Sequence, residues 1–205
     1  MIVRLSVLRK ADGDTMATLI IGLILFFGAH VTPTFPPFRA GLVERFGLGP
    51  FKGIFTAASL LGLILIIHGV SVMRGSAQDA WIWSPPVWSR HLAFALMLPA
   101  FVLIAAAYIP SHIREKVGHP MLAAIMIWAL AHLFANGDLL ALLLFGPFLA
   151  FAVYDRISVS RRAPAARAPA REWGGDVAAL LVGVVLWAAT LFWLHRLAGV
   201  PLLPG

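Results

Sequence analysis

The chain alternates long runs of apolar residues with short polar segments. Six runs approach the length that a helix needs to cross a bilayer, about 20 residues. They cover residues 16–34, 53–73, 91–108, 120–135, 139–154 and 177–197. This pattern predicts an all-α fold, a polytopic integral membrane bundle of about six transmembrane helices. Only Asn136, Gly137 and Asp138 separate the fourth and fifth runs, which predicts a tight helical hairpin.

The segments outside the runs suggest four parts of the chain. Residues 1–15 form an N-terminal extension, and we expect the natural start at Met16, directly before the first run. Residues 16–156 form the transmembrane core. Residues 157–175 form a basic loop rich in Arg, Ala and Pro, expected to be a flexible linker against anionic headgroups. Residues 176–205 carry a C-terminal transmembrane helix.

Composition supports a membrane protein and excludes several chemistries. The chain is 60% hydrophobic and 12% charged, with a mean hydropathy of +0.90, whereas soluble domains carry roughly 25% charged residues. It has no cysteine, which excludes disulfides, thiolate-ligated haem, iron–sulfur clusters and cysteine nucleophiles. The net charge of +7 comes from basic residues between apolar runs. This placement favours topology signals and anionic lipid over nucleic acid as a partner.

Basic residues also predict the orientation. The segments after the first, third and fifth runs carry about ten Lys and Arg residues, against about six on the other side. The positive-inside rule then places those three segments in the cytoplasm and the N-terminus outside.

Four histidines carry the candidate chemistry. His30, His68 and His132 lie inside apolar runs, and His119 opens the run that contains His132. A polar ring in hydrocarbon is costly and is retained mainly where it faces a bundle interior and has a function. We therefore expect a buried metal or haem site.

The residues alone leave the pairing of the histidines open. His119 and His132 are about 20 Å apart on one helix and face nearly opposite sides, so they are not expected to bind one iron. Depth favours His68 with His132, whereas the helix break at Pro33 favours His30. His30 has an alternative role, bonding carbonyls of its own helix that the break frees.

Other residues receive smaller roles. Trp128, His132 and Asn136 are spaced by four and predict one polar–aromatic stripe on a helix. Asp138 is expected to cap the following helix, or else to orient a histidine. We expect no small-residue dimer motif from Gly62 and Gly69. The histidines at the ends of runs are assigned no role: His91, His112 and His195.

The chain resembles the NnrU family of bacterial membrane proteins. Three segments carry the resemblance: AHVTPTFPPFR, FTAASLLGLILIIHG and GHPMLAAIMIWALAHLFANGD. Together they extend the likeness over residues 16–156. The family implies a multi-pass protein of the bacterial inner membrane, linked to nitrite and nitric oxide respiration, that is, denitrification. Its plant relative resembles zeta-carotene cis-isomerase, a membrane enzyme that uses haem b.

The resemblance also implies the ligands. His30 and His132 correspond to the haem- and metal-binding histidines, and His119 or His68 would assist. Met121 stands where the plant enzyme has glutamine, and its cysteine has no counterpart here. No catalytic residue is predicted.

We consider three functions for this chain. The first is a haem b-binding protein that supports denitrification or isomerises a lipid-soluble substrate. The second is a non-enzymatic assembly, electron-transfer or sensing partner of a respiratory reductase. The third comes from a more distant similarity to small membrane methyltransferases, which also carry an HP at a helix start and a tight helical hairpin, although no adenosylmethionine site follows Tyr154. The expected partners are the lipid bilayer, a lipid-soluble substrate and a respiratory protein, with no nucleic acid.

Overall fold

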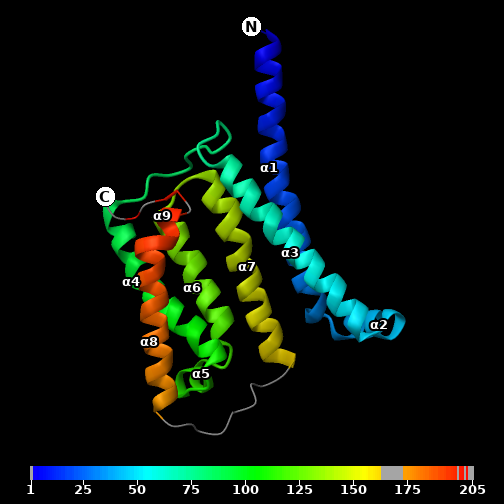
Figure 1. Ribbon diagram of the computed structural model, residues 1–205, viewed down its shortest axis with the longest axis vertical. Coiled ribbons are helices and arrows are strands. Elements are labelled where there is room, and N and C mark those ends of the chain that lie inside the picture. The colour runs from blue at the N-terminus through cyan, green and yellow to red at the C-terminus, as the bar shows by residue number, and fades with distance from the viewer. Residues whose placement is uncertain (1, 163–172, 198, 201, 203–205) are drawn as a thin grey trace. The chain divides into compact units, whose positions relative to one another are not determined.

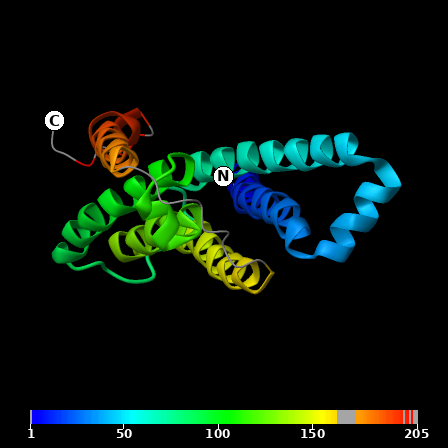
Figure 2. The same cartoon turned by 90° about the horizontal axis from the view of Figure 1, so that it is seen from below.

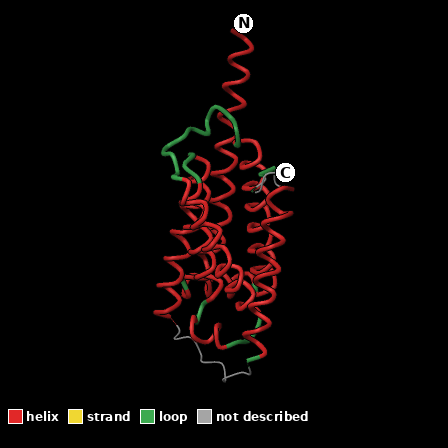
Figure 3. The backbone as a smooth tube through the Cα atoms, turned by 90° about the vertical axis from the view of Figure 1, so that its left-hand side faces the viewer, coloured by secondary structure: helices red, strands yellow, loops and turns green. Residues whose placement is uncertain are grey.

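The computed structural model describes residues 2–162, 173–197, 199, 200 and 202, and this part of the chain is helical without strands (Figure 3). This confirms the all-α prediction. The helices are α1 (Ile2–Val31), α2 (Pro36–Phe46), α3 (Leu48–Met73), α4 (Val87–Tyr108), α5 (His112–Val117), α6 (Pro120–Ala135), α7 (Leu139–Arg162), α8 (Gly174–Ala189) and α9 (His195–Leu197). A 3-10 turn, Thr32–Thr34, follows α1, and a π-helical segment, Thr190–Leu194, joins α8 to α9.

Among the residues that the structure describes, five stretches are long and apolar enough to cross a membrane: Met16–Thr34, Leu48–Met73, Val87–Tyr108, Leu139–Arg162 and Gly174–Leu197. The sixth apolar helix, α6, has 16 residues and rises about 24 Å, short of a core of roughly 30 Å. The chain is therefore a membrane protein with five full-length candidate spans and one shorter apolar helix.

The predicted boundaries hold best around the hairpin. α6 ends at Ala135 and α7 begins at Leu139, as the sequence predicts. In contrast, α7 continues to Arg162, into the segment expected to be a loop. Arg162 Nη2 lies 3.2 Å from Asp155 Oδ1 and supports this last turn. Residues 163–172 of the basic loop lie outside the described residues, as does Met1. The start at Met16 stays a prediction, since α1 runs without a break from Ile2.

The described chain divides into two compact units, and the first comprises Met1–Ser84 and Gly137–Pro147. Within it, α1 packs along α3, and α2 leads from the end of α1 to the start of α3 (Figure 2). The helices touch through glycine. A Cβ on Gly69 would lie 2.7 Å from Leu19 Cα, and one on Gly62 would lie 2.7 Å from Phe26 N. These two glycines therefore let α3 approach α1 within the chain, and the expectation that they form no dimer motif stays a prediction.

The second unit comprises Pro85–Asn136 and Phe148–Gly205, and α4 packs in it against α6 and α8 (Figure 1). Small residues make these contacts. A Cβ on Gly183 of α8 would lie 2.6 Å from Val102 Cα of α4. Ala105, Ala106 and Ala179 form a buried cluster. Close backbone approach through small residues is typical of helices packed in a membrane.

Candidate functional site

His30 lies in the last turn of α1, where the chain leaves the helix for the 3-10 turn. Its Nδ1 is 2.7 Å from the carbonyl oxygen of Phe26. The ring stacks on Phe26 at a centroid distance of 4.2 Å and leans on Phe55 of α3 at 5.3 Å. The accepting carbonyl belongs to the regular turn of α1, since the missing N–H of Pro33 would instead free that of Ala29. The bond therefore orients the imidazole and does not repair the break.

His132 lies in the last turn of α6 with a matching arrangement. Its Nδ1 is 2.8 Å from the Trp128 carbonyl oxygen, and the two rings are 5.3 Å apart. Asn136 Nδ2 donates in turn to the His132 carbonyl at 2.8 Å. The predicted stripe of Trp128, His132 and Asn136 thus exists. The His132 and Asn136 side chains each bond to the backbone carbonyl of the residue four positions earlier, and together they form a ladder on α6. Phe148 packs edge-on against Trp128 at 5.3 Å and extends the stripe to α7.

The shared geometry determines which nitrogen can bind a metal. A carbonyl oxygen only accepts hydrogen bonds, so Nδ1 carries the proton in both rings. In the neutral imidazole the lone pair then lies on Nε2. A histidine that ligates a metal normally donates its other N–H to a carbonyl or carboxylate, which fixes the tautomer and the ring orientation. The two histidines therefore have the donor chemistry that haem iron takes from axial imidazole.

His195, which sequence analysis assigned no role, lies beside His132. The two rings are nearly parallel, at 10° and a centroid distance of 6.2 Å. His195 Nδ1 is 3.2 Å from the carbonyl oxygen of Thr190, five residues earlier, because the chain is π-helical there. Such π-helical turns recur at functional sites. No pattern in the sequence predicts this π-helical turn, so the contact between His132 and His195 could not be predicted.

His119 occupies the N-terminal end of α6, and His132 its C-terminal end. The helix between them is continuous, so the predicted separation of about 20 Å holds. Burial of the ring and then the charge of Arg156 lower the pKa of His119, while Asp155 acts in the opposite direction. Arg156 Nη2 also donates to the Val117 carbonyl at 3.0 Å, which holds it near the start of α6. His119 is therefore neutral at pH 7.

His68 is exposed on α3, away from the face that packs on α1. Its carbonyl accepts a hydrogen bond from Ser71 Oγ at 2.7 Å. His30 and His68 belong to the first unit, and His119 and His132 belong to the second. The structure describes each unit by itself, so the pairing of His30 or His68 with His132 stays a prediction. The neighbour that the described residues give His132 is His195.

Asp138 acts as a helix cap. Its Oδ1 accepts from the Ala141 N–H at 2.6 Å, at the first turn of α7, which confirms the preferred reading of this residue. Asp79 supports the same turn by accepting from the Leu140 N–H at 3.0 Å. The segment of residues 80–83 docks here as well, since Ile82 N donates to the Gly137 carbonyl at 2.7 Å. The hairpin turn is thus held by a loop far away in sequence.

His112 also has a role that the sequence did not reveal. Its Nδ1 lies 2.6 Å from Asp176 Oδ2, and the second carboxylate oxygen accepts from the Ile113 N–H at 3.0 Å. The ring of Trp173 packs against His112 at 5.1 Å. Asp176 is buried, and its partners lie more than sixty residues earlier. This cluster joins α5 to the start of α8, and no local pattern could have indicated it.

Comparison with known proteins agrees with this architecture. The family model described as NnrU protein matches residues 18–202, nearly the whole chain and both units. Comparisons with curated proteins and with solved structures found no match. The match includes the helix ends that carry His30 and His132. The chain belongs to the NnrU family.

Proposed function

We propose that this protein binds haem b in the bacterial inner membrane, and that His30 and His132 are the residues that would hold it. The observation that carries the proposal is the arrangement that the two histidines share. Each sits in the last turn of an apolar helix and holds Nδ1 2.7–2.8 Å from the carbonyl four residues before. Each also packs on the aromatic ring of that same residue. Two imidazoles with Nε2 as the lone-pair nitrogen are what a bis-histidine site requires.

The surrounding residues set the orientation of the two rings. Phe26 and Phe55 hold the His30 ring from α1 and α3. His30 stands one residue before the end of α1, where the 3-10 turn begins, and His132 belongs to the ladder of hydrogen bonds on α6. Haem b, when bound, supplies a redox-active or Lewis-acidic iron. We propose that this iron supports nitrogen-oxide respiration or the cis–trans isomerisation of a lipid-soluble substrate. His119 and His68 remain the assisting candidates.

The neighbour of His132 favours a second candidate function. His195 offers an imidazole 6.2 Å away within the same unit. If His132 and His195 together held the haem, it would supply electron-transfer chemistry and not substrate activation. The protein would then serve as an electron-transfer, sensing or assembly partner of a respiratory reductase.

The haem content of histidine variants tests both candidate functions. The full chain is purified in detergent, and haem per protein is measured for His30→Ala, His132→Ala and His195→Ala. The matched control is His91→Ala, because His91 is exposed at the start of α4. The first candidate predicts loss of haem in the His30 and His132 variants, with the His195 variant like the control. Loss in the His132 and His195 variants alone supports the second candidate. Equal retention in all four variants contradicts both.

A further inference from the structure

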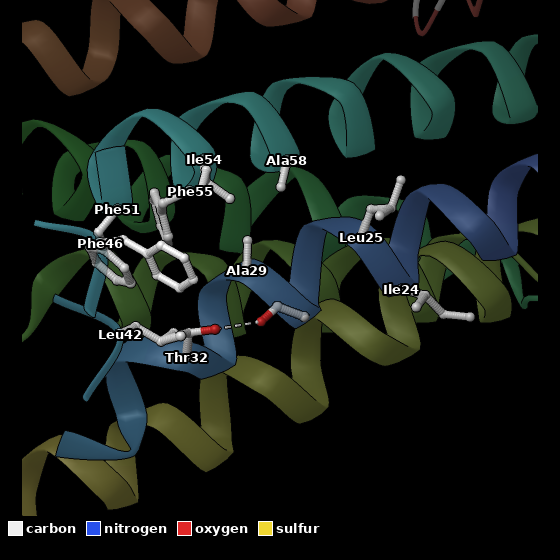
Figure 4. A pocket seen from close by; sticks show the side chains of 11 residues that line it. Ile24, Leu25, Ala29, Thr32, Leu42, Phe46, Phe51, Ile54, Phe55 and Ala58 are labelled. Atoms are coloured by element: carbon white, nitrogen blue, oxygen red, sulfur yellow. Dashed lines mark hydrogen bonds between the residues drawn. The ribbon is translucent and has the colours of Figure 1, made fainter. Parts of the chain in front are cut away.

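The first unit contains an apolar pocket enclosed by α1, α2 and α3, with a volume of about 390 Å³ (Figure 4). This volume falls in the range of small-molecule sites, about 300–1,000 Å³. Phenylalanine rings close one end, and aliphatic side chains from α1 line the other. Its lining consists of Ile24, Leu25, Gly28, Ala29, Thr32, Leu42, Phe46, Phe51, Ile54, Phe55 and Ala58.

The lining suits a hydrocarbon chain. Thr32 provides the polar side chain of this lining, and its hydroxyl donates to the Gly28 carbonyl at 3.1 Å (Figure 4). Along α1 the pocket extends from Ile24 to Thr32, which is about 12 Å of helix. An apolar slot of this length takes part of an extended chain, and because the tail moves from one hydrocarbon environment to another, the slot contributes shape and packing contacts and no hydrophobic transfer free energy.

Positive charge lies at the phenylalanine end. The guanidinium carbon of Arg39 is 5.6 Å from the centre of the Phe51 ring, and that of Arg45 is 5.4 Å from the centre of the Phe46 ring. Both rings line the pocket. Lys52 adds a third exposed cation, and Glu44 is the acidic residue of this segment. The rim therefore carries a net positive charge directly beside an apolar slot.

The depth of this rim matches that of a lipid headgroup. The phenylalanine end lies where α1 ends and α3 begins, at the ends of the two candidate spans Met16–Thr34 and Leu48–Met73. The topology prediction places this end on the cytoplasmic side, where anionic lipids give the leaflet a negative potential. An apolar slot that opens beside arginines at this depth fits a molecule with an apolar tail and an anionic head.

We infer that this pocket is a binding site for an anionic phospholipid. One acyl chain lies between α1 and α3, against Ala29 and Ala58, and the phosphate lies beside the guanidinium groups of Arg39 and Arg45. A zwitterionic lipid brings the same phosphate together with a choline cation that the arginines repel, so charge complementarity selects the lipid with a net negative charge. The inference does not depend on haem binding.

The experiment measures lipid binding to the detergent-purified full chain by native mass spectrometry. The probes are dioleoyl phosphatidylglycerol and dioleoyl phosphatidylcholine, which share their tails and differ in charge. The wild type should bind one phosphatidylglycerol in preference to phosphatidylcholine. In the Arg39→Gln/Arg45→Gln variant this preference should be about twenty-five times smaller, since each cation near the headgroup contributes about fivefold. The Arg74→Gln/Arg90→Gln variant loses the same charge outside the pocket and should bind like the wild type.

A second pair of variants tests the slot itself. A Cβ on Gly28 or on Gly53 meets no atom within 4 Å, but only Gly28 lines the pocket. Gly28→Leu should fill the slot and abolish the bound lipid with either headgroup, while Gly53→Leu should leave it in place. Three results would each overturn the inference: equal wild-type affinity for the two lipids, full preference in the Arg39/Arg45 variant, or unchanged binding in Gly28→Leu. Recovery of a neutral isoprenoid in place of phospholipid would overturn it too.

Discussion

Gly62 offers the most direct test of how helix packing positions His30. Gly62→Ala places a Cβ 2.7 Å from the backbone nitrogen of Phe26, 3.0 Å from its Cα and 2.9 Å from the Gly22 carbonyl oxygen. These are backbone atoms of α1, so no side chain can rotate to make room. Phe26 is also the residue whose carbonyl and ring hold His30. The substitution should therefore push α1 away from α3 and disturb the imidazole.

Two opposing effects set the magnitude. Overpacking of a tight contact costs about 1–3 kcal/mol. Alanine gains up to about 1 kcal/mol over glycine inside a helix. The overpacking exceeds the gain, so Gly62→Ala should lower the free energy of unfolding by about 1–2 kcal/mol. For a chain of about this size, that is a fall in Tm of roughly 2–8 °C.

Gly53→Ala is the matched control, because Gly53 lies on the same helix and an added Cβ there meets no atom within 4 Å. It should raise Tm slightly through helix propensity alone. Thermal unfolding of both variants in one detergent, followed by circular dichroism at 222 nm, shows whether each substitution raises or lowers Tm. If Gly62→Ala stabilises the protein as much as Gly53→Ala does, the close approach of α1 and α3 does not exist.

Three further outcomes follow from the contacts. Asp138→Ala removes a helix cap and should cost about 1 kcal/mol, seen as faster amide exchange in the first turn of α7. Asp176→Ala should lower Tm, and because His112 shares the same cluster, adding His112→Ala should lower it little further. Because the pKa of His119 is lowered in the folded protein, the unfolded state binds more protons at this residue. His119 therefore favours folding above pH 6.5, and this contribution to the free energy of unfolding is lost as the pH falls. Histidine NMR titration should show that pKa rise toward 6.5 in Arg156→Gln.

The sequence predicted those features that arise from local patterns. The lengths of the apolar runs predicted the helices, and the turn residues Asn136–Asp138 predicted the end of α6 and the start of α7 to the residue. The spacing of four between Trp128, His132 and Asn136 gave the ladder on α6, because that spacing is a property of one helix. Asp138 as a cap follows from the same local logic.

Features that depend on distant segments were not predictable. The contact between Asp176 and His112 depends on the packing of α4 against α8. The role of Gly62 and Gly69 depends on the close approach of α1 to α3. His195 reaches His132 because a π-helical segment changes the direction of the ring near the end of the chain. The length of α7 was underestimated because charged residues after Tyr154 suggested a loop, whereas Asp155 and Arg162 pair along the helix.

The visible absorption spectrum of the detergent-purified full chain, from cells supplied with haem precursor, tests the central claim most directly. The account predicts a Soret band with the α and β bands of low-spin, bis-histidine haem b after reduction. It further predicts that these bands disappear in His132→Ala and persist in His91→Ala. A protein that is folded and free of a Soret band, even after incubation with excess haemin, would contradict the claim.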